Sequence, residues 1–167
     1  LNSSGEQSVT RNALQGKRVL ITGTTGYLGK VILEKIIREI PDIGGVNLII
    51  RGSKKFPTAE ERFNAEILSS SIFDHLKETN PASLDAFCQN KLTCVSGEIT
   101  EDAFGLSPAA YAELAENTDV FVNSAASVNF HEALDVALKI NTLCLNNVAD
   151  FAAAAGDIPV VQISTCY

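Results

Sequence analysis

The chain of 167 residues contains no methionine, so the natural start codon is missing and the sequence is expected to be a cut or processed piece of a protein. It also lacks any uninterrupted apolar run of about 18 residues, the length that a membrane helix needs. Its N-terminus has no basic start followed by an apolar run. These absences argue against stable membrane insertion and against a secretory signal.

Positive charge is scarce, because 13 Lys and Arg residues stand against 20 Asp and Glu residues, for a net charge of -7. Such a surface repels the phosphates of nucleic acids, so no nucleic-acid partner is expected. The four cysteines show no C-x₂-C or C-x₄-C spacing, which argues against a zinc site and a dense disulfide scaffold. Free cysteines are typical of a cytosolic protein, so the predicted location is cytoplasmic.

Short β-branched or apolar runs alternate with segments whose apolar residues recur at helical spacing. Strands are expected at residues 17–22, 46–50, 91–96, 119–123 and 158–164. Helices are expected at residues 27–40, 107–116 and 129–155. Such alternation requires a parallel sheet with helices on both faces. The predicted fold class is therefore α/β, a Rossmann-like doubly wound parallel sheet of about five strands.

Three segments need a separate interpretation. Residues 53–90 are expected to form a helical insertion between the second and third strands, because Thr58 and Glu61 have capping-box spacing. The same spacing of Asn129 and Glu132 predicts the start of the last helix, with Phe130 on its apolar face. Residues 1–16 are mostly small and polar, and we expect a flexible arm with Leu14 docked on the domain.

The chain stops at Tyr167, directly after the fifth expected strand. Ligands of a doubly wound sheet sit just outside the carboxyl ends of its strands. Residues 17–167 are therefore predicted to be the incomplete N-terminal part of a nucleotide-binding domain, truncated after strand five. The unfinished sheet surface also makes self-association of the fragment an expected partner interaction.

The strongest motif is the sequence T-G-T-T-G-Y-L-G at residues 22–29, placed between an expected strand and an expected helix. Gly23 permits the tight turn, Gly26 lets the backbone approach a pyrophosphate, and Gly29 lets the helix pack closely on the sheet. The N–H groups and positive dipole end of the helix would hold the phosphate charge. The alternative is a glycine-rich turn without a ligand. The predicted cofactor-binding residues of this motif are Gly23, Thr24, Thr25, Gly26, Tyr27, Leu28 and Gly29.

The end of the second strand predicts which dinucleotide binds. A cofactor with a free ribose 2′-hydroxyl calls for a carboxylate about 20 residues beyond the glycine motif. That position holds Arg51, which is followed by Ser53, Lys54 and Lys55. Cations suit a 2′-phosphate, so NADPH is predicted over NADH. A solvated surface turn is the alternative interpretation.

Five stretches resemble one enzyme family. The G-x-x-G-x-x-G spacing resembles the extended short-chain dehydrogenase/reductases. Residues 97–107 resemble the "GDIT…GLS" stretch of fatty acyl-CoA reductases, and residues 123–130 resemble their "H-S-A-A-x-V-x-F" loop. Residues 141–144 fall at their "N-x-x-G", and residues 164–167 match "S-T-x-Y". Together these stretches are similar to the bacterial alcohol-forming fatty acyl-CoA reductases that supply fatty alcohol for wax esters.

The resemblance implies that the whole enzyme passes hydride from NADPH to a long-chain acyl-CoA and reduces the aldehyde to the alcohol. It implies that Thr165 is catalytic, since its hydroxyl would hydrogen-bond the substrate carbonyl oxygen as it gains charge. Asn141 would either order the active-site backbone or cap a helix. The resemblance adds Glu98, Ile99, Ser124, Ala125, Ala126 and Asn141 to the cofactor-binding residues.

The chain departs from the family in several respects. Glu98 stands where Asp is more frequent beside the adenine, and Asn123 replaces a histidine. The family's catalytic Tyr-x-x-x-Lys pair occurs nowhere in the sequence, so the fragment alone is expected to be inactive. The acyl-CoA substrate is expected to bind through the missing part.

Two other functions remain open at this point. A carrier-protein thioester reductase, or a sugar-nucleotide epimerase or dehydratase, would bind its dinucleotide cofactor through the same motifs. A non-catalytic dinucleotide-binding module would keep the glycine turn and lack the catalytic residues.

Overall fold

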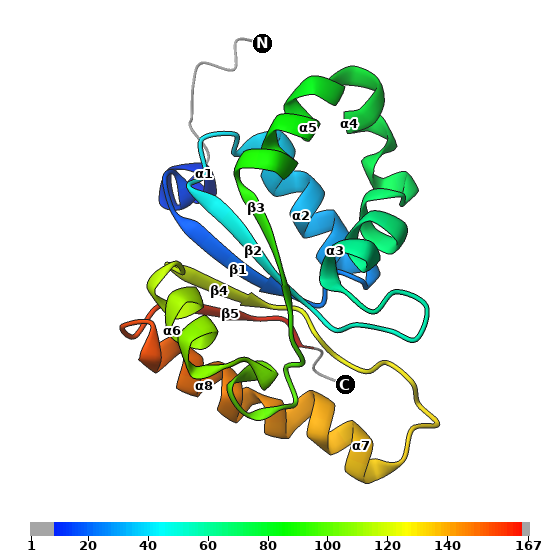
Figure 1. The fold of residues 1–167 in the computed structure, drawn as a ribbon, viewed down its shortest axis with the longest axis vertical. Helices are drawn as coiled ribbons and strands as arrows, with labels where there is room; N and C mark the ends of the chain where they lie inside the picture. Colours follow the sequence, from blue (N-terminus) through cyan, green and yellow to red (C-terminus); the bar gives the residue numbers. More distant parts are fainter. Residues whose placement is uncertain (1–8, 165–167) are drawn as a thin grey trace.

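A computed structural model describes residues 9–164 of the chain, and its centre is a parallel sheet of five strands in the order β3-β2-β1-β4-β5 (Figure 1). The strands are β1 (Arg18–Thr22), β2 (Gly45–Ile50), β3 (Leu92–Ser96), β4 (Val120–Asn123) and β5 (Val160–Gln162). Every neighbouring pair is parallel, with β1 paired to both β2 and β4. The Rossmann-like doubly wound sheet predicted from the sequence is confirmed.

The sheet carries helices on both faces because its central strands bury side chains on both sides. Val19 and Ile21 of β1 face one hydrophobic core, whereas Leu20 between them faces the other. All three are fully buried, as in a strand covered on both sides. The alternation along one strand therefore defines two separate cores.

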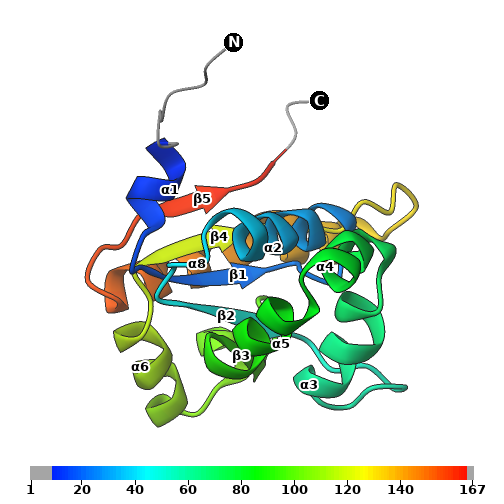
Figure 2. The same ribbon diagram turned by 90° about the horizontal axis from the view of Figure 1, so that it is seen from above.

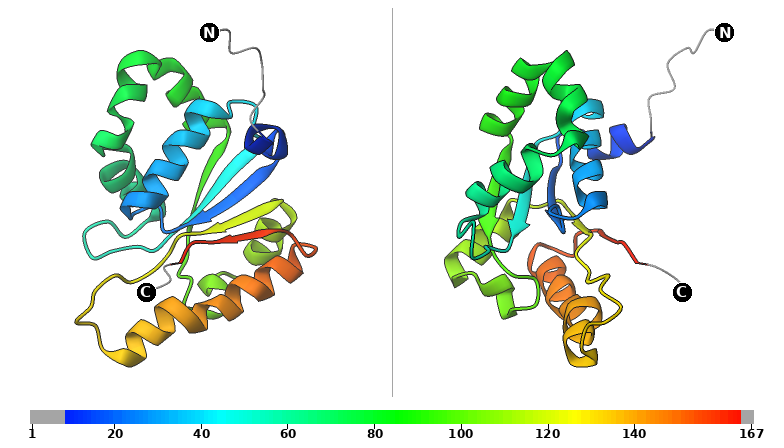
Figure 3. Two further views of the ribbon diagram at one scale, coloured as in Figure 1. Left: turned by 180° about the vertical axis from the view of Figure 1, so that it is seen from behind. Right: turned by 90° about the vertical axis from the view of Figure 1, so that its right-hand side faces the viewer.

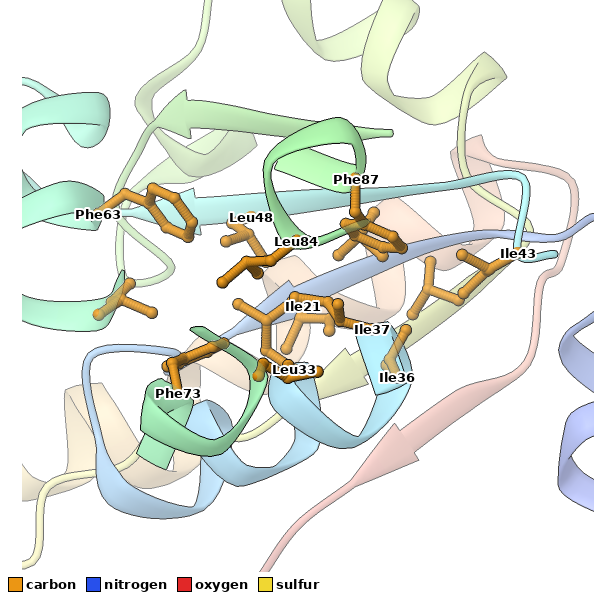
Figure 4. Close-up of a cluster of buried hydrophobic side chains, with 14 of the residues drawn as sticks. Ile21, Leu33, Ile36, Ile37, Ile43, Leu48, Phe63, Phe73, Leu84 and Phe87 are labelled. Atoms are coloured by element: carbon orange, nitrogen blue, oxygen red, sulfur yellow. The ribbon is translucent and has the colours of Figure 1, made fainter. Parts of the chain in front are cut away.

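The first core lies between the sheet, α2 and the insertion between β2 and β3 (Figure 4). Its helical segments are α2 (Tyr27–Glu39), α3 (Ala59–Arg62), η1 (Phe63–Leu68), η2 (Ser71–Phe73), α4 (Asp74–Thr79) and α5 (Pro81–Asn90). Leu33 of α2 packs in the same cluster as Phe73 and Phe87 of the insertion. Figures 1 and 2 show α3, α4 and α5 gathered toward the β2–β3 half of the sheet.

The second core contains three phenylalanine rings and lies on the opposite face of the sheet. It is covered by η3 (Asp102–Gly105), α6 (Pro108–Glu116) and α8 (Cys144–Ala154). The segments α7 (Leu134–Leu138) and η4 (Lys139–Leu143) lead into α8 and bury none of their own residues. The rings of Phe104, Phe121 and Phe151 are mutual neighbours, with centroid separations of 5.3 to 6.0 Å. This spacing is typical of packed aromatic pairs.

Two of the predicted helices begin at residues whose side chains cap them. The Thr58 side chain accepts from the N–H of Glu61 and the Glu61 side chain accepts from the N–H of Thr58, which is a complete capping box. Ser107 caps α6 with its side chain, and Pro108 occupies the first turn. The first helix of the insertion therefore begins after Thr58, as its capping-box spacing predicted.

The N-terminal arm and the start of the last helix differ from the prediction. Residues 9–14 form the short helix α1 (Val9–Leu14) instead of a loose arm, and Leu14 does pack against the first core. Residues 124–133 form a loop, in which the Asn129 side chain accepts from the N–H of His131 and the Glu132 side chain accepts from the Ser127 hydroxyl instead of completing a capping box. The expected apolar face is consequently absent at Phe130, which is 96% exposed.

The part of the chain from residue 9 to residue 164 contains no helix that is both long and apolar enough to cross a lipid bilayer.

Candidate functional site

A cavity of about 380 Å³ opens at the carboxyl ends of β1, β2 and β4. The loops that follow β2 and β4 leave the sheet on this same side (Figure 3, left). The sequence-predicted residues that line it are Gly23, Thr24, Thr25, Gly26, Arg51, Glu98, Ile99, Ser124, Ala125 and Ala126. Lining residues that sequence reasoning did not assign to the site are Thr22, Ile49, Ile50, Arg62, Gly97, Ser127, Glu132 and Ile140. The sequence-predicted lining residues come from four separate stretches of sequence, which thus meet at one site.

Two glycines allow backbone segments to touch at this edge. Gly23 has φ +75°, and a Cβ placed there would lie 2.3 Å from the carbonyl oxygen of Ser124. A Cβ on Gly29 would lie 2.3 Å from the carbonyl oxygen of Gly23. Only hydrogen fits at either position, so the glycine turn packs directly on the β4 loop and on α2.

Gly26 differs from these two, because the space beside it is open. Among the described residues, the neighbour that a Cβ on Gly26 would meet within 4 Å is the Gly23 carbonyl oxygen, at 3.3 Å. Gly26 is the N-cap of α2 and provides no side-chain hydrogen bond to the first turn. The first N–H groups of α2 therefore have no side-chain cap, and they carry the positive end of the helix dipole.

These features fit a phosphate-bearing ligand. A side chain at Gly26 would fill the space in front of the helix N-terminus, which is where backbone N–H groups bind anions. The buried hydroxyl of Thr24 also has no hydrogen-bond partner among residues 9–164. Tyr27, Leu28 and Gly29 lie in the first turn of α2 and outside the cavity lining.

At the end of β2, the Arg51 guanidinium is already engaged by the protein. Its Nη1 donates to Oε2 of Glu98 at 3.0 Å. Arg62 of α3 donates from Nη1 to the carbonyl oxygen of Arg51 at 2.7 Å. Ser53 and Lys54 lie outside the lining, and the Ser53 hydroxyl instead accepts from the N–H of Phe56 at 3.0 Å. No spacing rule in the sequence signalled Arg62, because the insertion brings it to the site.

At the end of β4, Asn123 is a fully buried hydrogen-bonding centre. Its Oδ1 accepts from the hydroxyl of Thr22 and, at 3.3 Å, from the N–H of Ala125. Its Nδ2 donates to the side chain of Gln162 at 2.7 Å. The amide thus joins β1, β5 and the loop that lines the cavity.

The β4 loop is fixed from the other side by Asn141 of η4. Oδ1 of Asn141 accepts from the N–H of Ser127 at 2.8 Å, and Nδ2 donates to the Ser127 carbonyl at 3.0 Å. The Ser127 hydroxyl donates to Glu132. Asn141 lies inside a helical run and not at its start, so it orders the loop backbone and caps no helix.

Cys144 follows on the same helical run and is buried in the core that includes Ile99. Its thiol donates to the carbonyl oxygen of Ile140 at 2.8 Å. Burial, with a smaller effect of the Glu98 charge, raises the pKa of the Cys144 thiol. The thiol therefore stays protonated at neutral pH and offers no nucleophile to the cavity.

Thr165, the predicted catalytic hydroxyl, lies outside the described residues. Within residues 9–164, no group of three or more His, Cys, Asp or Glu side chains could hold a metal ion. The chemistry that this arrangement supports is binding of a phosphate-containing ligand.

Comparison with known proteins identifies the family. The profile of a family described as "Male sterility protein" matches residues 21–167. The chain is 42% identical over 155 residues to "Fatty acyl-CoA reductase 2, chloroplastic" of Arabidopsis thaliana, covering 92% of this chain and 25% of that protein. It is 35% identical over 156 residues to "Alcohol-forming fatty acyl-CoA reductase" of Simmondsia chinensis, covering 92% and 31%.

A solved structure agrees on the fold. The terminal R domain from the myxalamid PKS-NRPS biosynthetic pathway superposes with a TM-score of 0.70 at 24% identity, covering 90% of this chain and 35% of that one. The chain therefore spans roughly a quarter to a third of the length of these proteins. With the glycine turn and the cavity at the strand ends, these matches show that the chain belongs to the male sterility protein family of NAD-binding domains.

Proposed function

We propose that this chain is the NADPH-binding portion of a fatty acyl-CoA reductase that reduces long-chain acyl-CoA through the aldehyde to the fatty alcohol. The observation that carries this proposal is a cavity that brings the glycine turn, the N-terminus of α2, Arg51 and the loop 124–126 together. The names of the related reductases support the substrate class. A bound nicotinamide cofactor would supply hydride.

Each side of the cavity has one role in this proposal. The N-terminus of α2 and the open space at Gly26 receive the pyrophosphate. Ser124, Ala125 and Ala126 have small side chains, which let the backbone lie along the dinucleotide. Glu98 and Ile99 border the adenine, and Arg51 binds the 2′-phosphate.

The acyl-CoA chemistry requires groups beyond this cavity. Thr165 donates a hydrogen bond to the substrate carbonyl oxygen as negative charge develops there. The sequence contains no Tyr-x-x-x-Lys pair to supply a proton. We therefore expect the 167-residue chain to bind NADPH without turning over acyl-CoA, whose acyl group binds to the remainder of the enzyme.

Calorimetric titration of the chain with NADPH and with NADH tests the cofactor assignment. We expect NADPH to bind about tenfold more tightly or better, because charge-assisted hydrogen bonds to the 2′-phosphate are strong. Gly26→Ala should weaken both cofactors, because the methyl group enters the pyrophosphate space. Gly45→Ala is the matched control, since its Cβ would lie 3.4 Å from the Lys91 carbonyl at the opposite strand ends. Equal affinities, or a preference for NADH, would contradict the assignment.

A separate experiment tests the expected inactivity of the 167-residue chain toward acyl-CoA. The chain is mixed with NADPH and palmitoyl-CoA, and NADPH absorbance is followed. No consumption is expected from these residues alone. Acyl-CoA-dependent oxidation of NADPH would refute the inferred need for the tyrosine and lysine.

A further inference from the structure

The Arg51 main chain and the Arg51 side chain are held by different partners. The main-chain carbonyl accepts from Arg62, whose Nε also donates to Oε2 of Glu66 at 2.9 Å. The side chain is 65% exposed and pairs with Glu98. The position of residue 51 is thus fixed, while its guanidinium can exchange one acceptor for another.

Glu98 is the better anchored member of the pair. Its side chain is 22% exposed, and its Oε1 accepts from the N–H of Thr100 at 3.3 Å. Its own N–H donates to the carbonyl oxygen of Phe104 at 3.0 Å, which ties the residue to the η3 segment. The carboxylate therefore stays at the edge of the cavity and presents Oε2 to Arg51.

We propose that Glu98 sets the preference between NADPH and NADH by competing with the ribose 2′-phosphate for Arg51, an inference that rests on the proposed cofactor site. A phosphate that binds Arg51 must displace the Glu98 carboxylate from the guanidinium or share the guanidinium with it. NADH brings no anion to this position and leaves the Arg51–Glu98 pair intact. Glu98 therefore weakens NADPH binding selectively and narrows the discrimination that Arg51 provides.

Two substitutions separate charge from reach. Glu98→Gln keeps the side-chain length and removes the charge, whereas Glu98→Asp keeps the charge and withdraws it by one methylene group. Either change releases Arg51, so NADPH should bind about two- to fivefold more tightly, the range expected for loss of an exposed ion pair. NADH affinity should stay nearly constant, because NADH brings no 2′-phosphate that could gain from the release of Arg51.

Glu101→Gln is the matched control. Glu101 lies three residues along the same loop and pairs with Lys139 at 3.3 Å, away from Arg51. This variant changes the net charge by the same amount, so an equal gain in NADPH affinity would show a general charge effect and overturn the proposal.

A double-mutant cycle by calorimetry with Arg51→Gln completes the test. The gain from Glu98→Gln should vanish in the Arg51→Gln background. A gain that survives there would mean that Glu98 repels the phosphate directly, and an unchanged NADPH affinity in both Glu98 variants would also overturn the proposal. Failure of the unsubstituted chain to bind either cofactor would instead refute the proposed function, and this inference would fall with it.

Discussion

The hydroxyl of Thr22 on β1 donates a hydrogen bond to Oδ1 of Asn123 on β4, and both side chains are buried. This contact crosses the strand pair that frames the cavity, and Asn123 extends it to Gln162 of β5. The Asn123 side chain therefore has a structural role, because it ties three strands together at the edge of the cavity.

Replacing Asn123 with Leu should destabilise the chain by about 2 kcal/mol or more, because the Thr22 hydroxyl and the Gln162 amide lose their partner. Urea unfolding followed by circular dichroism measures this change. The double variant Thr22→Val/Asn123→Leu should recover part of the loss, since a matched apolar pair leaves fewer polar groups unsatisfied. An additive, larger loss in the double variant would argue against the hydrogen bond as the cause.

Gly23→Ala should cost more stability than the same change at Gly16. Both glycines have positive φ, +75° and +69°, so both variants carry the backbone strain. A Cβ at Gly16 meets nothing within 4 Å, whereas one at Gly23 collides with the Ser124 carbonyl. We expect roughly 1 kcal/mol for Gly16→Ala and at least twice that for Gly23→Ala in urea unfolding. Equal costs would mean that the β4 loop moves away freely.

Asn141→Ala should loosen the loop that lines the cavity, because two hydrogen bonds to the main chain of Ser127 are lost. Hydrogen exchange at the Ser127 amide should become faster, and NADPH affinity should fall by about two- to tenfold. Asn146→Ala on the same helical run is the control, as Asn146 is exposed. Unchanged exchange at Ser127 would show that other contacts hold the loop.

Asp119 should make stability depend on acid pH. The backbone N–H of Arg18 donates to its Oδ2 at 2.7 Å, and this bond, with the Arg18 charge, lowers the pKa of Asp119. A lowered folded-state pKa gives stability that is present above the unfolded value of about 3.9 and is lost as pH falls through the folded value.

Asp119→Asn should therefore be less stable than the unsubstituted chain at pH 7, and the difference should shrink once the pH falls below about 4. Urea unfolding across this range measures it. Asp102→Asn, which removes one negative charge at an exposed position, is the control. A difference that is constant with pH would assign the effect to packing and not to charge.

The sequence predicted those parts of the fold where every local signal agrees. β1, the glycine turn and α2 follow one another, and a β-branched run, glycine spacing and helical periodicity each indicate the same structure. The capping box at Thr58 was predicted correctly for this reason. The identical spacing at Asn129 and Glu132 was misleading, because Glu132 accepts from Ser127 and not from the N–H of Asn129.

The candidate site, too, could be predicted only where local sequence signals define it. Its glycines and the loop 124–126 are recognisable from the sequence, and the structure brings them to one cavity. The pairing of Arg51 with Glu98, and the arrival of Arg62, depend on where the insertion and β3 pack. Spacing along the chain carries no information about such partners.

The strand order also bears on how the chain folds. β1 lies between β2 and β4, so the glycine turn near residue 23 meets the loop near residue 124 only after about a hundred residues have been synthesised between them. A partly folded chain in which only β1, β2 and β3 have paired lacks the side of the cavity that the loop after β4 provides. A dinucleotide that binds only the complete cavity would therefore shift the folding equilibrium, by mass action, toward molecules in which both halves of the sheet have joined.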